Sequence, residues 1–515
     1  MNPRIKRALL SVYDKTGLVP LAKTLESLGV EILSTGGTAQ LLKKEGIKVI
    51  EVSEVTHFPE MLSGRVKTLH PNLHAGLLAL RDDPQHLETL AEHNIKPIDL
   101  VVVNLYPFWD AVKTKTDERE IVEMIDIGGP SMLRSAAKNF RFVASVSDPA
   151  DYPRVIEELK KGEGRLGDDT RRHLAAKVFR LTSGYDGMIQ NYLANGKATG
   201  TETLPAHYSL NFEKIQDLRY GENPHQAGAV YREKGVLSGV VNAEKLHGKE
   251  LSFNNLLDLD AAWELVSAFS ETACVIIKHM NPCGFAVGKT PADAFKHAFA
   301  RDPLSSFGGV IGLNAKLDLK TAETILKSGF IECIIAKDFD KAAVEALKAK
   351  KNLRLLKIDG RRDSRLDFKR VSGGLLLQQP DEKDPRAEDL HVVTKAAPKK
   401  GQIADLLFSF KVCRYVRSNA IVIAKNGATL GLGMGQPSRV DSCDTAFRKA
   451  GKKAKGAVLA SDGFFPKPDS IALAKKHGIS AIIQPGGSVQ DAEVIAACDR
   501  AKIAMVFTGV RHFKH

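Results

Sequence analysis

The sequence predicts an α/β protein of more than one domain. Over the first 150 residues, short apolar runs alternate with helical patterns, as in βα units around a parallel sheet. This rhythm is lost over residues 160–205, which are helical and polar and end in a Gly/Thr-rich stretch. Strand-like runs then return. Because 515 residues exceed what one hydrophobic core usually supports, we expect the chain to divide near residue 200.

Composition narrows the class of protein. The chain is 43% hydrophobic and 26% charged, and no apolar run reaches the roughly 18 residues that suggest a membrane span. Its N-terminus lacks the apolar core of a signal peptide. The six cysteines form no C-x-x-C pair, which argues against a disulfide framework and a cysteine zinc site. We expect a cytoplasmic protein with reduced thiols, no membrane association and no metal.

A net charge of +13 raises the question of nucleic-acid binding. The basic clusters at 395–400 and 452–455 are short, and aromatic residues, only 6% of the chain, do not interleave with them. Helix-turn-helix and zinc-finger spacings are absent from the sequence. The charge therefore favours anionic small-molecule substrates over nucleic acid.

The first elements follow one another closely. We expect strands at 8–12 and 30–33 and helices at 17–27 and 38–44. The loops at 11–17 and 34–38 each join a strand to a helix, where hydroxyls, free N–H groups and the helix dipole favour a phosphate. Neither loop has Walker A spacing. A plain glycine turn is the alternative interpretation of each.

Three further segments of this half carry reactive side chains, at 63–71, 104–107 and 126–131. The last opens a helix in which Arg134 and Lys138 share one face and could meet an anion. An ordinary capped helix with solvated basic residues is the alternative. The strands expected at 99–104 and 142–146 end in turn residues, which suggests loops gathered at one sheet edge.

The second half holds the most informative motif. An apolar run at 273–277 leads into Lys278 and His279, and the Asn-Pro-Cys-Gly at 281–284 predicts a rigid turn that fixes both side chains. A base beside a cation at a strand end can move protons and stabilise negative charge. A surface lysine beside a hydrogen-bonded histidine is the alternative. The polar loop at 218–226 also resembles a binding loop.

A hairpin is predicted around Asn426 and Gly427, because Asn-Gly between apolar runs favours a type I′ turn. Its returning arm leads to Arg439, whose guanidinium could hold a phosphate or carboxylate. Composition alone predicts that the basic, aromatic tail at 508–515 is frayed. A faint similarity suggests that 273–284 and 457–466 are halves of an internal duplication.

Four motifs together resemble one family. They are Lys278–Gly284, Arg219–Gln226, Gly64–Pro71 and Arg511–Phe513. The chain resembles the PurH family, which joins phosphoribosylaminoimidazolecarboxamide (AICAR) formyltransferase to IMP cyclohydrolase. The match extends from Ser11 to His515, and the main motifs occur in the family's order. The resemblance implies a methylglyoxal-synthase-like parallel-sheet cyclohydrolase domain at 1–200. It implies a formyltransferase domain of two cytidine-deaminase-like subdomains at 201–515.

The resemblance also implies the reaction and its partners. A formyl group would pass from the co-substrate 10-formyltetrahydrofolate to AICAR, giving formyl-AICAR (FAICAR) and tetrahydrofolate, and FAICAR would then close to IMP. The deaminase zinc ligands are missing from this sequence, so we expect no metal. The family also implies a homodimer with transferase sites at the subunit interface.

Transfer to a conjugated, weakly nucleophilic amine needs proton removal and oxyanion stabilisation. His279 is our candidate base and Lys278 our candidate charge stabiliser. The resemblance adds residues around the ribotide and its phosphate: Arg219, Tyr220, Asn419, Arg439, Phe464, Arg511 and His515. It adds three folate-binding candidates: Ser306, Gly309 and Glu332.

For ring closure, the resemblance implies four catalytic residues. Asp126 and Lys138 would relay protons, and Lys67 and Tyr106 would polarise the formyl oxygen. The nucleotide would be held by Ser11, Lys15, Ser34, Thr35, Gly36, Gly37, Thr38, Arg65 and Thr68. A nucleotide-binding regulatory protein would keep the phosphate loops without the acid–base residues, and this chain has both.

Overall fold

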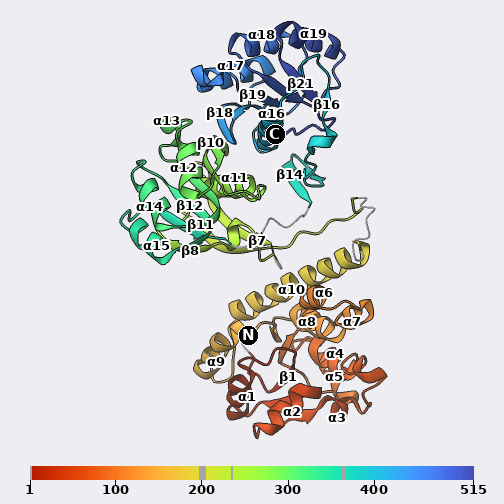
Figure 1. Ribbon diagram of the computed structural model, residues 1–515. Coiled ribbons are helices and arrows are strands. Elements are labelled where there is room, and N and C mark those ends of the chain that lie inside the picture. Colours follow the sequence, from red (N-terminus) through yellow and green to blue (C-terminus); the bar gives the residue numbers. More distant parts are fainter. Residues whose placement is uncertain (1–2, 196–203, 234–235, 359, 361–365) are drawn as a thin grey trace. The chain divides into compact units, whose positions relative to one another are not determined.

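A computed structural model of the chain describes residues 3–195, 204–233, 236–358, 360 and 366–515. It divides into two compact units, Met1–Asn211 and Phe212–His515 (Figure 1). The boundary expected between residues 200 and 201 lies outside the described residues. We describe each unit by itself.

The first unit is built on a parallel five-stranded sheet in the order β3-β2-β1-β4-β5. Its strands are β1 (Arg7–Val12), β2 (Glu31–Ser34), β3 (Ile50–Glu51), β4 (Leu100–Asn104) and β5 (Ala144–Val146). Its helices are α1 (Leu18–Ser27), α2 (Gly36–Lys44), α3 (Val52–Thr56), α4 (Pro71–Leu78), α5 (Pro84–Glu92), α6 (Phe108–Thr114), α7 (Glu118–Val122), α8 (Gly128–Lys138), α9 (Tyr152–Lys161) and α10 (Asp168–Asn195). The predicted βα units are confirmed. Strand order reverses at β1, and such sheets bind ligands at the carboxyl ends of the strands beside this point, here β1 and β4.

Both faces of this sheet are buried, which explains the nearly continuous apolar strands. Leu10 packs in a core with residues of α1 and α9, whereas its neighbour Leu9 packs in a second core with residues of α4, α8 and α10. Successive side chains of a strand point to opposite faces. The helices on both sides therefore hold the loops at the sheet's carboxyl edge in fixed positions.

The second unit is built on one twelve-stranded sheet in the order β16-β21-β20-β19-β17-β18-β10-β9-β11-β12-β13-β8. The strands of its first half are β8 (Glu244–His247), β9 (Ala273–Lys278), β10 (Asn281–Val287), β11 (Val310–Leu317), β12 (Cys333–Phe339) and β13 (Arg354–Lys357). Those of its second half are β16 (His391–Val392), β17 (Ile421–Lys425), β18 (Ala428–Gly433), β19 (Val458–Ser461), β20 (Ala481–Gln484) and β21 (Ala504–Phe507). Two separate ribbons are β6 (Phe212–Leu218) with β7 (Gly228–Glu233), and β14 (Asp367–Val371) with β15 (Gly374–Gln378).

The two halves have the same topology. In each, an edge strand is followed by a helix, a hairpin, a second helix and three further strands joined by helices. The first-half helices are α11 (Phe253–Ser267), α12 (Pro291–Phe299), α13 (Pro303–Ser306), α14 (Leu319–Leu326) and α15 (Lys341–Leu347). The second-half helices are α16 (Lys400–Cys413), α17 (Arg439–Ala450), α18 (Asp469–Lys476) and α19 (Asp491–Ala501). This repeat matches the predicted pair of subdomains.

The expected internal duplication has a different register. Strand β9 corresponds to β17, because both lead into a two-residue hairpin after α11 and α16, respectively. The segment 457–466 contains β19, which corresponds to β11. The pairing of 273–284 with 457–466 was therefore wrong, because short apolar runs look alike whichever strand they form.

One core joins the two halves. Helices α11 and α16 share a face of the sheet, where Phe408 lies 5.7 Å from Phe269 and 5.5 Å from Phe285 between ring centroids. The opposite face is divided into one core for each half. Separating the halves would expose the shared core to water.

The turn predicted at 281–284 is wrong. Asn281 already belongs to β10 and pairs with Lys278, which leaves His279 and Met280 as the two loop residues. Both have left-handed backbones, with φ of 53° and 60°, as a type I′ turn requires. The turn predicted at Asn426 and Gly427 is confirmed, with φ of 53° and 67°.

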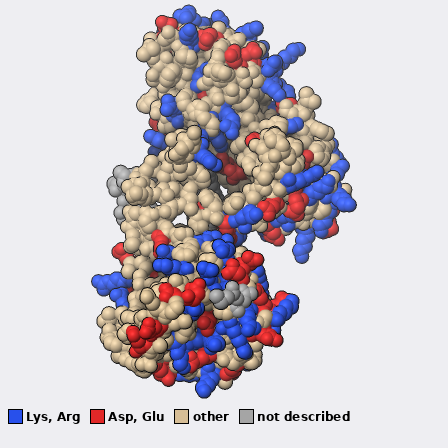
Figure 2. Space-filling model, turned by 180° about the vertical axis from the view of Figure 1, so that it is seen from behind, with Lys and Arg blue, Asp and Glu red and all other residues tan. Residues whose placement is uncertain are grey.

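The surface carries both signs of charge. Figure 2 shows one face, on which Lys and Arg are interspersed with Asp and Glu. On this face, Lys and Arg do not form a continuous basic stretch along which a nucleic-acid backbone would bind. Among the described residues, none of the helices combines the length and the apolar character needed to cross a bilayer.

Candidate active sites

Hydroxyl groups fix the two phosphate-loop candidates of the first unit. Thr38 Oγ1 accepts from the N–H of Val12 at 3.1 Å and donates to its carbonyl at 3.0 Å. Buried Ser34 donates to a backbone carbonyl of β1. Ser11 and Thr35 are less buried, with their hydroxyl oxygens 3.0 Å apart. Ser34 and Thr38 therefore position the loops, while Ser11 and Thr35 are the better placed to meet a ligand.

Two cations lie beside the start of α2. A Cβ on Gly36 would lie 3.5 Å from Lys67 Nζ, and a Cβ on Gly37 would lie 4.0 Å from Lys15 Nζ. The N-cap residue Thr35 makes no side-chain capping bond, so the first N–H groups of α2 remain for a ligand. Lys67 Nζ also pairs with Glu60 Oε1 at 3.0 Å, so the helix N-terminus and Lys15 are the groups here that favour an anion.

Asn104 and Tyr106 bring β4 to the same edge. Asn104 Oδ1 accepts from the N–H groups of Tyr13 and Asp14 at 2.7 and 2.9 Å, and its amide donates back to Asp14. The rings of Tyr13 and Tyr106 meet edge to face, 5.6 Å apart. The sequence analysis placed Asn104 in a reactive segment but did not predict this role, in which its side chain fixes the loop that follows β1.

Asp126 is held in a crowded loop. Its carboxylate accepts from the N–H of Gly129 at 2.8 Å and from that of Tyr106, but burial outweighs these bonds and raises its pKa. A Cβ on Gly129 would lie 2.6 Å from Asp126 Oδ2, and one on Gly128 would lie 2.6 Å from Thr68 Oγ1. Asp126, Tyr106 and Thr68 thus gather at one place, and a half-buried carboxyl with a raised pKa suits proton transfer.

Lys138 lies apart from this group. Lys138 is in the last turn of α8, so ten residues of helix place it about 15 Å from Gly128. It lines a pocket of about 630 Å³ together with Arg134 and Arg172. Arg65 is exposed and pairs with the carboxylate of Glu123.

In the second unit, Lys278 and His279 line a pocket of about 290 Å³. Residues of both halves contribute, including Asn281 from β10 and Gln436 from the loop before α17. Lys278 Nζ donates to the carbonyl of Phe307 at 2.8 Å, which ties the turn to the loop that contains Ser306 and Gly309.

The three folate candidates lie together, although their polar groups have protein partners. Buried Ser306 donates through Oγ to the carbonyl of Asp302 and accepts through its own carbonyl from the N–H of Gly309. Glu332 donates its N–H to Gly309, and its carboxylate pairs with Arg354 at 2.5 Å.

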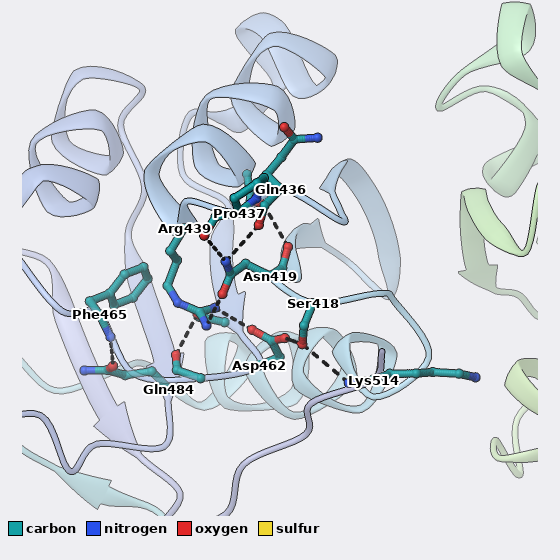
Figure 3. Close-up of polar contacts among 12 residues, drawn as sticks. Ser418, Asn419, Gln436, Pro437, Arg439, Asp462, Phe465, Gln484 and Lys514 are labelled. Carbon is teal, nitrogen blue, oxygen red and sulfur yellow. Dashed lines mark hydrogen bonds and ion pairs between the residues drawn. The ribbon is translucent and has the colours of Figure 1, made fainter. Parts of the chain in front are cut away.

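Arg439 is the centre of a buried polar cluster (Figure 3). Its guanidinium pairs with Asp462 and donates to Ser461 Oγ at 2.8 Å and to Asn419 Oδ1 at 2.7 Å. Asp462 is fully buried. The amide of Asn419 donates in turn to the carbonyl of Gln436 at 2.8 Å, which connects the cluster to the pocket of Lys278 and His279.

The C-terminal tail packs against this cluster, so the frayed tail predicted from composition is wrong. The N–H of Ser418 donates to the carbonyl of Lys514 at 2.9 Å. The ring of Phe513 lies 6.0 Å from the guanidinium carbon of Arg439, 4.5 Å from that of Arg511 and 5.8 Å from the His515 ring. The tail is ordered by contacts with residues distant in the sequence, which its own composition does not reveal.

Arg219 and Tyr220 stand at the end of β6. The guanidinium of exposed Arg219 lies 5.8 Å from the Tyr220 ring, and a 2.6 Å bond from Gly221 to Gln226 closes the loop. Phe464 follows β19 and is partly exposed. Within the described ranges, no group of three or more His, Cys, Asp or Glu side chains is placed to hold a metal ion.

Sequence comparison covers both units. A family model described as AICARFT/IMPCHase bienzyme matches residues 136–449, more than half of the chain, and one described as MGS-like domain matches residues 17–131. The chain belongs to the AICARFT/IMPCHase bienzyme family. The resemblance inferred from the motifs is therefore confirmed, as is the methylglyoxal-synthase-like character of the first unit.

Two curated relatives support this membership over nearly the whole chain. The chain is 50% identical over 511 residues, 99% of its length and all of the relative's, to "Bifunctional purine biosynthesis protein PurH" of Thermoanaerobacter sp. (strain X514). It is 52% identical over 519 residues, with 99% and 100% coverage, to the protein of the same name from Persephonella marina (strain DSM 14350 / EX-H1). A solved structure described as "Crystal structure of ForH" is 36% identical and covers 38% of this chain and 100% of its own, with a TM-score of 0.34.

We predict that Asp126→Asn raises the melting temperature of the protein at neutral pH. Burial raises the folded-state pKa of Asp126, so its contribution to stability is full below the unfolded pKa of about 3.9 and is lost as pH rises through the folded pKa. Asparagine avoids that loss. The gain should shrink as the pH falls toward the ordinary carboxyl range, in thermal melts across pH; a pH-independent difference would contradict this account.

We predict that Asp462→Ala destabilises the protein by about 3–5 kcal/mol, because it leaves the Arg439 guanidinium buried without its counter-charge. Urea unfolding would measure the loss. Asp444→Ala, an exposed position on the same helix as Arg439, is the control and should change stability by less than about 0.5 kcal/mol. Equal effects of the two variants would refute the structural role of the pair.

Proposed function

We propose that the chain is a bifunctional enzyme of purine biosynthesis. Its second unit transfers the formyl group of 10-formyltetrahydrofolate to AICAR, giving FAICAR and tetrahydrofolate, and its first unit dehydrates and cyclises FAICAR to IMP. The observation that carries the proposal is that each unit has its own acid–base site, in a chain at least 50% identical over its length to bifunctional relatives.

In the transferase, the side chains of the β9–β10 turn do the chemistry. As the 5-amino group attacks the formyl carbon, His279 removes its proton and Lys278 stabilises the resulting oxyanion. The bond from the formyl carbon to the folate N10 then breaks, and His279 returns the proton to N10 as tetrahydrofolate leaves. Both line the same pocket. The ribotide and its phosphate are held by Arg219, Tyr220, Asn419, Arg439, Phe464, Arg511 and His515. Of these residues, Arg439 acts through Asn419, because its guanidinium already has three protein partners.

The folate lies beside this turn, at Ser306, Gly309 and Glu332. The bond from Lys278 to the carbonyl of Phe307 supports that placement, because it joins the catalytic turn to the folate loop. In this proposal, protein groups alone carry out the proton transfer and the charge stabilisation.

In the cyclohydrolase, the phosphate binds at the start of α2 beside Lys15. The carboxamide nitrogen then attacks the formyl carbon, and water leaves as the purine ring closes. Asp126 moves the proton, with Lys67 and Tyr106 polarising the formyl oxygen. The role of Lys138 rests on the family resemblance alone, because α8 holds it away from Asp126.

Two activities in one chain can be separated by mutation. His279→Ala should abolish tetrahydrofolate release from AICAR and 10-formyltetrahydrofolate while leaving conversion of added FAICAR to IMP intact. Lys67→Ala should do the reverse and accumulate FAICAR. Absorbance assays that follow tetrahydrofolate and IMP separately would measure both. Absence of tetrahydrofolate release from the unmodified protein would overturn the proposal and favour a ligand-binding role.

We propose in addition that the chain is a cytoplasmic homodimer. Its six cysteines are all free, as expected in a reducing compartment. The ribbons β6–β7 and β14–β15 meet through Phe212 and Phe368, and they expose further apolar side chains such as Tyr231 and Leu376. Exposed apolar surface of this kind marks protein interfaces.

Sedimentation equilibrium should therefore give twice the chain mass of 56.1 kDa. Tyr231→Glu combined with Leu376→Glu should shift the protein toward monomer and lower transferase activity, if these ribbons form the interface. A double variant that remains dimeric would place the interface elsewhere, and a monomeric unmodified protein would refute the dimer.

A further inference from the structure

The repeated topology of the second unit places a matching carboxylate in each half. Asp258 is the sixth residue of α11, and Asp405 is the sixth residue of α16. Each of these helices precedes a hairpin with a two-residue turn. Asp258 and Asp405 are therefore equivalent positions before equivalent turns.

Each carboxylate holds the turn of its own half. Asp258 Oδ1 accepts from the N–H of Met280 at 2.6 Å. Asp405 accepts from the N–H groups of Asn426 and Gly427, each at 2.9 Å. Met280 and Gly427 are both the second residue of a type I′ turn, so the same backbone group is bound in both halves.

The two turns differ in how readily they form. Asn426 and Gly427 are the residue types that type I′ turns favour. His279 and Met280 adopt the same left-handed conformation although L side chains disfavour it. A second bond, from the Asn281 amide to the His279 carbonyl at 3.0 Å, also acts on the first turn. The turn that carries His279 thus depends more on outside support than its counterpart does.

We propose that Asp258 is a positioning residue for formyl transfer, which holds the β9–β10 turn in the left-handed conformation that directs Lys278 and His279 into their pocket. This inference rests on the proposed function of that turn. Asp405 performs the same structural task in the half without a lysine–histidine pair. Removal of Asp258 should therefore affect chemistry, and removal of Asp405 should affect stability alone.

The test compares Asp258→Ala with Asp405→Ala in the full-length protein, and the cyclohydrolase reaction of the same chain reports on integrity. Asp258→Ala should lower the transferase kcat at least about 10-fold, because small misplacements of catalytic groups have large effects. KM for AICAR and the cyclohydrolase kcat should stay within about twofold. Asp405→Ala should leave both kcat values within about twofold.

Two rescue variants distinguish positioning from charge. Asp258→Asn keeps an acceptor oxygen and should retain most of the transferase kcat. Adding Met280→Gly to Asp258→Ala should restore activity, because glycine adopts the left-handed conformation without support. Full transferase activity in Asp258→Ala, equal losses in the two alanine variants, or failure of both rescues would each overturn the inference. An unmodified protein without transferase activity would instead refute the proposed function.

Discussion

The buried ion pair of Arg439 and Asp462 holds together the segments around the site in the second half of the second unit. It lies where α17 begins, at the ends of β17 and β19, with the C-terminal tail packed on it. Removing two charges from water is expensive, and the attraction between them offsets that only when further hydrogen bonds satisfy both groups. Here Ser461, Asn419 and Ser418 supply those bonds. Segments distant in sequence are thereby held in one arrangement.

The charged groups of the first unit are arranged differently from the buried ion pair of the second. The cations of the first unit stay near the surface, beside the open N-terminus of α2, where an incoming anion can replace water. Asp126 is half-buried, and its pKa is raised because backbone N–H groups compensate only part of its desolvation. The cationic groups are thus accessible at the surface, while the proton-transfer group is partly shielded from water. This division is the one that catalysis of ring closure needs, since a raised pKa brings the carboxyl nearer to working pH.

Local patterns allowed the sequence to predict much of this architecture. Residues close together in the chain determine the apolar spacing that predicts β1, α1 and β2, and they also determine the Asn-Gly turn at 426. The turn at His279 and Met280 could not be read in that way, because neither residue favours it and Asp258 supports it from another element. The order of the C-terminal tail could not be predicted from its composition for the same reason, since the tail contacts Ser418 and Arg439. Sequence reasoning also named Ser34 and Thr38 as ligand residues, whereas their hydroxyls are bonded to β1.

The two halves of the second unit differ in the residues of their equivalent hairpin turns. Both use the same carboxylate-supported hairpin, but only one replaces the turn-forming Asn-Gly with a histidine and a methionine. Side chains in a left-handed backbone are strained, and such strain persists where the surrounding structure over-determines it. The shared core beneath α11 and α16 provides that surrounding, because it holds both helices, and hence both carboxylates, against one sheet. The strain is therefore confined to the turn at His279 and Met280, while the turn at Asn426 and Gly427 is relaxed. Two halves with the same fold can thus differ in the reactive side chains that they carry.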